Sequence, residues 1–65
     1  MKIIVNGQSL EVTATLLDAA LGELGYGEAR VATALNGEFV PVPARASTSL
    51  DNGDRLEILA PMQGG

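Results

Sequence analysis

Two of the three Asn-Gly pairs, Asn6-Gly7 and Asn36-Gly37, constrain the fold of this sequence more than any other feature. Asn-Gly between short runs of strand-forming residues is the strongest short-range signal for a two-residue hairpin turn. A turn of that length also fixes which residues of the two strands face each other. The sequence therefore predicts two β-hairpins, the first within residues 2–12 and the second within residues 31–40.

The register of the first hairpin can be tested against its charges and its apolar residues. A two-residue turn pairs Ile3 with Leu10, and it places the apolar residues of both strands on one face, toward the core. The same register sets Lys2 opposite Glu11, which would give a cross-strand pair of opposite charge on the other face. Register and side-chain chemistry therefore agree.

The second hairpin is expected to join a strand at residues 31–36 to a short strand at residues 38–40. Its register places Ala34 opposite Phe39, with both side chains on the outer face. Residues 55–60 alternate in polarity and predict a last strand, with Leu56 and Ile58 inward and Leu59 outward.

A helix is predicted between the hairpins by apolar residues with i, i+3, i+4, i+7 spacing. These residues are Leu17, Ala20, Leu21 and Leu24. Thr15, with Asp18 three residues later, predicts an N-cap, and Gly25 predicts the end of the helix. A helix of about ten residues is unstable alone, so we expect it to pack on the sheet. Residues 44–54 are expected to form a polar connection anchored by Leu50.

These elements favour an α+β fold of the β-grasp (ubiquitin-like) type. We expect a mixed sheet of four or five strands, with the helix packed across one face. The 65 residues predict one domain at residues 1–60, followed by a flexible tail at residues 61–65.

The composition limits the chemistry that this chain can perform. It contains neither cysteine nor histidine, so we expect no disulfide, no metal site, no bound cofactor and no catalytic residue. Its net charge is −4 and its four basic residues are scattered, which argues against a nucleic-acid partner. No apolar run approaches the roughly 20 residues of a membrane span, and no signal peptide precedes the first strand. We therefore expect no membrane association and a cytoplasmic location.

The carboxyl-terminal Pro-Met-Gln-Gly-Gly is the candidate functional segment. Paired glycines lack side chains, so Gly64 and Gly65 could pass through a channel that other residues would block. Met62 and Gln63 complete the segment that we expect to thread into a partner, and Gly65 would present a free α-carboxylate. Five extended residues reach at most about 16–18 Å, which is enough to enter the active site of another protein.

Four outward residues of the predicted sheet form a candidate docking surface. Ile4, Ala34, Phe39 and Leu59 are expected, together with Ala32, on the face that the helix leaves open, with Leu59 next to the tail. A contiguous apolar patch there would be suited to partner binding.

Three segments of the sequence closely resemble the ThiS family, the ubiquitin-like sulfur carrier proteins of thiamine (thiazole) biosynthesis. They are the opening MKIIVNG, the central ALNGEFVP at residues 34–41, and the closing NGDRLEILAPMQGG at residues 52–65. The likeness extends over the whole chain, and the Pro-Met-Gln-Gly-Gly end is its most specific part.

The resemblance implies a carrier rather than an enzyme. A ThiF-type adenylating enzyme, using its own ATP and Mg²⁺, would convert the Gly65 carboxylate to an acyl-adenylate. A sulfur donor protein would then supply sulfur for a C-terminal thiocarboxylate, and a ThiG-type thiazole synthase would receive it. When free, the chain would be a monomer.

Three alternatives remain open from the sequence. Related carriers serve other pathways, such as molybdopterin synthesis, and share the fold and the Gly-Gly end. A ubiquitin-like protein modifier would form isopeptide adducts instead of a thiocarboxylate. An interaction domain with an inert tail would be unaffected by loss of Gly64 and Gly65.

Overall fold

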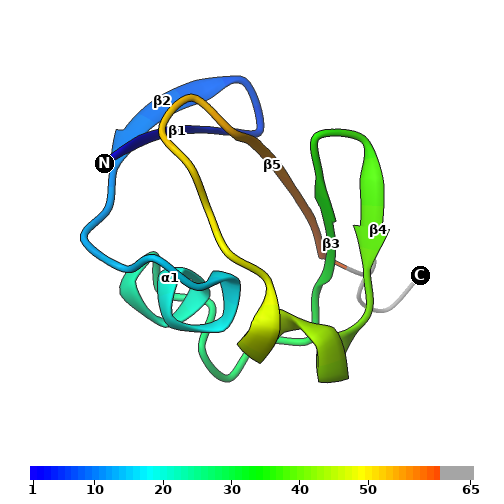
Figure 1. Ribbon diagram of the computed structural model, residues 1–65. Coiled ribbons are helices and arrows are strands. Elements are labelled where there is room, and N and C mark those ends of the chain that lie inside the picture. The colour runs from blue at the N-terminus through cyan, green and yellow to red at the C-terminus, as the bar shows by residue number, and fades with distance from the viewer. Residues whose placement is uncertain (61–65) are drawn as a thin grey trace.

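A computed structural model describes residues 1–60 of the chain as five strands, one α-helix and one 3₁₀ helix (Figure 1). In chain order the elements are β1 (Lys2–Val5), β2 (Gln8–Glu11), α1 (Leu17–Glu23), β3 (Ala32–Leu35), β4 (Glu38–Val40), η1 (Val42–Ser47) and β5 (Arg55–Leu59).

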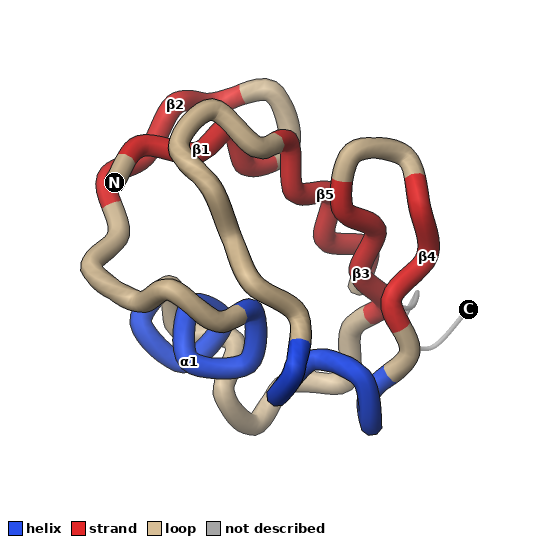
Figure 2. The backbone as a smooth tube through the Cα atoms, in the orientation of Figure 1, coloured by secondary structure: helices blue, strands red, loops and turns tan. Residues whose placement is uncertain are grey.

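The strands form a single mixed sheet in the order β2-β1-β5-β3-β4. β1 and β5 are parallel, whereas the other neighbouring pairs are antiparallel. The helix α1 lies on one side of this sheet, with η1 near it, and within residues 1–60 the other side carries no helix (Figures 1 and 2). The predicted β-grasp architecture is confirmed, with five strands, and the last strand of the chain occupies the centre of the sheet.

Both hairpins have the predicted register. Ile3 pairs with Leu10 across the first turn, and Ala34 pairs with Phe39 across the second. Asn6 and Asn36 have φ values of 49° and 51°, and each is followed by a glycine with positive φ, as a type I′ turn requires.

The expected contact between the charges of Lys2 and Glu11 is wrong in detail. The two residues are register partners, but the Glu11 carboxylate lies 3.5 Å from the amino-terminal nitrogen of Met1 instead. The long Lys2 side chain is exposed. An exposed lysine has little to gain from such a pair, because holding two long side chains together costs entropy.

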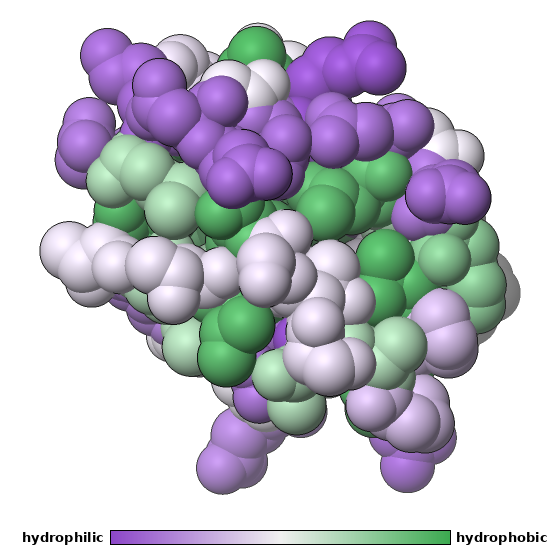
Figure 3. Space-filling view, viewed as in Figure 1, coloured by the Kyte–Doolittle hydropathy of each residue, from purple (hydrophilic) through white to green (hydrophobic). Residues whose placement is uncertain are grey.

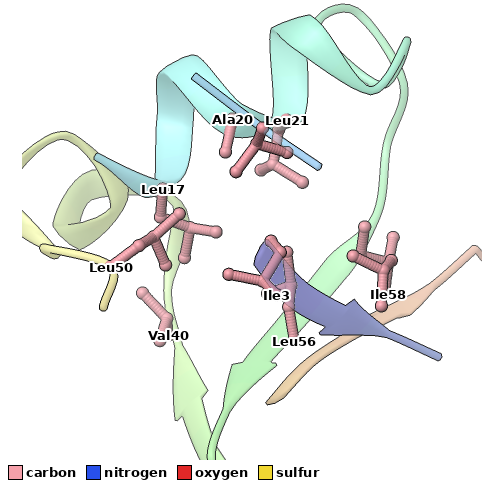
Figure 4. Close-up of a cluster of buried hydrophobic side chains, with 10 residues drawn as sticks. Ile3, Leu17, Ala20, Leu21, Val40, Leu50, Leu56 and Ile58 are labelled. Atoms are coloured by element: carbon pink, nitrogen blue, oxygen red, sulfur yellow. The ribbon is translucent and has the colours of Figure 1, made fainter. Parts of the chain in front are cut away.

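The hydrophobic core lies between the sheet and α1 (Figure 4). Inward residues of the first hairpin, of α1 and of β5 meet there, and Leu50 joins them from the connection before β5, as predicted. The fully buried side chains include Ile3, Val12, Leu17 and Leu56. The alternation of β5 is also confirmed, because Leu56 and Ile58 are buried while Leu59 is exposed.

The start of α1 differs from the prediction. Leu16, not Thr15, is the N-cap residue, and no side chain caps the helix. Leu16 instead forms an isolated β-bridge with Ser49, and the Leu17 N–H donates to the carbonyl oxygen of Thr48 at 2.9 Å. The backbone of a distant loop thus satisfies the donor that a local side chain was expected to satisfy.

The end of α1 follows the prediction. The Gly25 N–H donates to the carbonyl of Gly22 and the Tyr26 N–H to that of Leu21, which is the Schellman arrangement. Gly25 has a φ of 95°, a conformation that a residue with a side chain rarely adopts. The helix therefore begins one residue later than predicted and ends where it was predicted to end.

The connection at residues 41–50 contains η1, which the sequence analysis did not predict. Arg45 of η1 donates to the Val31 carbonyl at 2.6 Å and to the Thr33 hydroxyl at 3.2 Å. Thr33 is buried, and its hydroxyl donates to the Val40 carbonyl at 2.9 Å. Arg45 and Thr33 therefore fasten the connection to the β3–β4 hairpin.

Glu23 joins the end of α1 to the segment that leads into the helix. Its carboxylate accepts hydrogen bonds from the Thr13 N–H, at 2.9 and 3.1 Å, and from the Ala14 N–H at 3.0 Å. These donors, Thr13 first, lower the pKa of Glu23 because they favour the charged form. The resulting stabilisation is present above the ordinary glutamate pKa and is lost as the pH falls through the lowered value.

We expect Glu23→Gln to cause a small decrease in Tm at neutral pH, because the neutral amide is a weaker acceptor. The difference from the wild type should shrink in acid, where the wild-type carboxylate is protonated as well. Thermal unfolding, followed by circular dichroism from neutral to acid pH, measures the difference in Tm between the two proteins. Glu28→Gln, the same charge change at another exposed residue, is the control, and a decrease independent of pH would contradict this role.

Candidate functional site

The candidate site lies at the end of the central strand. β5 ends at Leu59, and the carboxyl-terminal segment follows one residue later in the chain. The predicted carrier residue Gly65 and the threading residues Met62, Gln63 and Gly64 lie outside the described residues, as does the predicted flexible tail. The described part of the site is therefore β5 and the surface around Leu59.

Both hairpin asparagines hold β5 in place. Asn6 accepts a hydrogen bond from the Ile58 N–H at 2.8 Å and donates to the Ile58 carbonyl at 3.1 Å. Asn36 accepts from the Arg55 N–H at 2.9 Å and donates to the Asp54 carboxylate at 3.0 Å. Each asparagine thus serves both its turn and the strand that carries the tail. The sequence analysis had assigned them to the turns alone.

The outer face of the sheet brings three of the four predicted docking residues together. Phe39 and Leu59 are exposed, at 69% and 71%, and with Ala34 they surround a hollow of about 340 Å³. Ala32 is register partner of Leu59 and also lines this hollow. We call these four residues, Ala32, Ala34, Phe39 and Leu59, the apolar patch.

Ile4 does not join the apolar patch, so the predicted docking surface was wrong at this residue. Ile4 is half-buried, has Arg55 as its register partner and lines a separate hollow with Arg55 and Glu57. Because β5 lies between β1 and β3, its outward charged residues separate Ile4 from Ala34.

Toward the start of β5, away from the apolar patch, the outer face of the sheet carries charged residues. In the view of Figure 3, hydrophilic residues gather along the top, over the β1–β2 hairpin, and apolar surface appears below them and toward β4. On the outer face of β5 the exposed residues are, in chain order, Arg55, Glu57 and Leu59, so the charged residues precede the apolar one.

A larger hollow of about 570 Å³ lies on the other side of Leu59. It is lined by residues of the segment 27–32, by Val42 and Arg45 of η1, and by Leu59. The guanidinium of Arg45 is held there by Val31 and Thr33, so its role in the described structure is to fix η1. The sequence analysis gave no role to Arg45, because its partners lie 12 and 14 residues away.

The described residues contain no metal-binding cluster, since no group of three acidic residues in 1–60 is arranged to hold an ion. Neither helix in the same part of the chain has the length and apolar character that crossing a membrane requires.

Fold and site together define a class: a small β-grasp protein whose central strand ends beside an apolar patch and is followed in the sequence by Pro-Met-Gln-Gly-Gly. The chain belongs to the ThiS family, whose family model matches residues 3–65.

Solved structures agree with this assignment. The crystal structure of the thiamine biosynthesis protein ThiS of Geobacter metallireducens is similar over the full length of both chains, with 32% identity and a TM-score of 0.84. A solution NMR structure of a thiamine biosynthesis protein from the same organism is 30% identical, with a TM-score of 0.79 over all of this chain and 88% of that one.

A curated relative is much longer. A thiazole synthase of Paramagnetospirillum magneticum is 39% identical over 66 residues, which cover all of this chain and 20% of the relative. The chain thus spans about a fifth of the length of the curated relative that it matches.

Proposed function

We propose that this protein is a sulfur carrier of thiamine biosynthesis that acts through a thiocarboxylate at Gly65. The observation that carries the proposal is the match to the ThiS family, which runs through the Gly-Gly end. The apolar patch supports it, because a carrier must be recognised by each enzyme that acts on its tail.

The proposed chemistry has two steps, both catalysed by partners. In the first, the Gly65 carboxylate attacks the α-phosphate of ATP, giving the acyl-adenylate and pyrophosphate. In the second, hydrosulfide (HS⁻) supplied by a donor protein attacks the acyl carbon, AMP leaves and the S–H proton is lost. The result is a thiocarboxylate, which keeps the sulfur nucleophilic and attached to the protein. ATP and Mg²⁺ would be bound by the ThiF-type enzyme, while this chain supplies the carboxylate and the means of recognition.

The proposed destination of the sulfur is the ring of the thiazole that a ThiG-type synthase makes. It is supported by the thiazole synthase of Paramagnetospirillum magneticum, in which a segment similar to this whole chain belongs to a larger protein. A carrier and its synthase joined in one chain would meet at high effective concentration.

A genetic experiment tests the pathway. Deletion of the gene should make the source organism dependent on added thiamine, and the wild-type chain should restore growth without it. A chain lacking Gly65 should not. Growth of the deletion strain without thiamine would remove the pathway assignment and favour a carrier of another pathway, such as molybdopterin synthesis, or a protein modifier.

We expect Phe39→Ala to weaken binding to the adenylating enzyme more than it weakens folding. Phe39 is 69% exposed, so its truncation should cost the fold less than about 1 kcal/mol. A buried aromatic anchor at an interface is commonly worth about 2 kcal/mol or more, which corresponds to roughly 30-fold in Kd.

Calorimetric titration and thermal unfolding measure the two effects of Phe39→Ala. Val42→Ala is the control, because Val42 is similarly exposed, at 65%, but lies outside the apolar patch. Unchanged affinity, or unfolding of the domain, would contradict the proposed role of Phe39.

A further inference from the structure

A row of three residues, two of which belong to the apolar patch, crosses three strands of the sheet. Phe39 of β4 is the register partner of Ala34 of β3, and Ala34 is the register partner of Glu57 of β5. Register partners on one face have Cβ atoms about 4.5–5.5 Å apart. Phe39 and Glu57 therefore stand about 10 Å apart, with only the methyl group of Ala34 between them.

This row forms part of a hollow that is lined mainly by apolar residues and has Glu57 as its charged end. Asn6 also lines it, with its amide bonded to the backbone of Ile58. Phe39, Leu59 and Glu57 surround the floor of small alanines in the hollow of about 340 Å³. Its dimensions suit one long side chain lying across the sheet. An apolar stem would contact Phe39, Ala34 and Leu59, and the end of the side chain would reach Glu57.

The charge of Glu57 selects the kind of side chain. Glu57 is exposed, and within residues 1–60 the sole ion pair joins Met1 to Glu11, so Glu57 has no cationic partner there. Lysine and arginine combine a long apolar stem with a cationic head, and they commonly lay the stem on apolar surface.

We propose that the hollow receives a lysine or arginine side chain of the partner enzyme, with its stem between Phe39 and Leu59 and its cation on Glu57. The inference rests on the proposed function, because it takes the partner to be an enzyme that acts on the tail. It adds the chemistry of the anchor, which the apolar patch alone does not specify.

Variants that change the charge or the shape of the hollow test the proposal. Each is titrated into the ThiF-type and the ThiG-type enzyme of the source organism to measure its Kd. Glu57→Gln should weaken binding to at least one of them about ten-fold at low salt, and Glu57→Lys more, with the differences shrinking as salt rises. Ala34→Leu should weaken binding to the same enzyme, because it fills the floor of the hollow.

Glu38→Gln is the matched control. It removes the same charge from the residue next to Phe39 in the sequence. Because neighbouring residues of a strand point to opposite faces, the Glu38 side chain lies on the other face of β4. This variant should bind within about two-fold of the wild type, since a rim charge far from the contact contributes little.

Three results would overturn the proposal. The first is that Glu57→Gln binds both enzymes as tightly as Glu38→Gln does. The second is that Ala34→Leu strengthens binding, which would indicate a flat apolar contact. The third is that equilibrium sedimentation shows Glu57→Gln to disrupt self-association, which would mean that a second copy of the chain occupies the hollow. The mass of the wild-type carrier after incubation with the adenylating enzyme and the sulfur donor tests the proposed function separately. If the thiocarboxylate forms while the binding results contradict the hollow, only the inference about the hollow fails.

Discussion

Removal of Gly65 is expected to abolish adenylation of this chain and to leave its melting temperature unchanged. In the proposed mechanism the acyl-adenylate forms at the terminal carboxylate, and deleting one residue withdraws that group by up to about 3.3–3.6 Å. A misplacement of even 1 Å can cost a reaction roughly 100-fold. The fold should not respond, because the buried core extends from Ile3 to Ile58 and a glycine has no side chain to bury.

ATP–pyrophosphate exchange measures adenylation of this variant, and circular dichroism measures its unfolding. Gly22→Ala is a suitable control, because a Cβ added at this exposed helix position meets nothing within 4 Å. That variant should keep full exchange. Exchange that survives the loss of Gly65 would place the reactive group elsewhere, and a large decrease in Tm would show that the domain depends on its last residue.

The largest effect on stability is expected from Leu56→Ala. Leu56 is fully buried in the central strand, and truncation of such a leucine costs about 2–5 kcal/mol. At roughly 0.05–0.15 kcal/mol per residue, a domain of this size has only about 3–10 kcal/mol of stability in total. Much of the Leu56→Ala population should therefore be unfolded at physiological temperature.

Leu59→Ala is the matched control, since it makes the same chemical change on the same strand at a residue that is 71% exposed. It should alter the free energy of unfolding by no more than about 0.5 kcal/mol. Urea unfolding of both variants compares them directly. Equal losses would mean that β5 does not have the inward and outward faces described above.

The parts of the fold that depend on local sequence were predictable. The hairpin registers follow from Asn6-Gly7 and Asn36-Gly37, and the faces of β5 follow from its alternation. The N-cap at Thr15 was wrong because the contacts of Leu16 and Leu17 come from Ser49 and Thr48, more than 30 residues away. No local pattern reports such a contact.

The error in the predicted docking surface also arose from the way segments far apart in the sequence come together. The shared face of Phe39, Ala34 and Leu59 was predictable, because the register of the second hairpin and the alternation of β5 both follow from the local sequence. Ile4 was wrongly included because the position of β5 between β1 and β3 could not be read from the chain order. That same position sets Glu57 beside Ala34, so the charged end of the hollow becomes visible only in the assembled sheet.

The central claim is that Gly65 carries sulfur, and the intact mass of the protein tests it most directly. The full chain would be incubated with the ThiF-type enzyme, ATP, Mg²⁺ and a sulfur donor, and then digested to locate any change. We expect the mass to rise by the difference between sulfur and oxygen, with the increase confined to the carboxyl-terminal peptide. An unchanged mass, with an enzyme proven active on another carrier, would contradict the claim and leave a β-grasp binding domain.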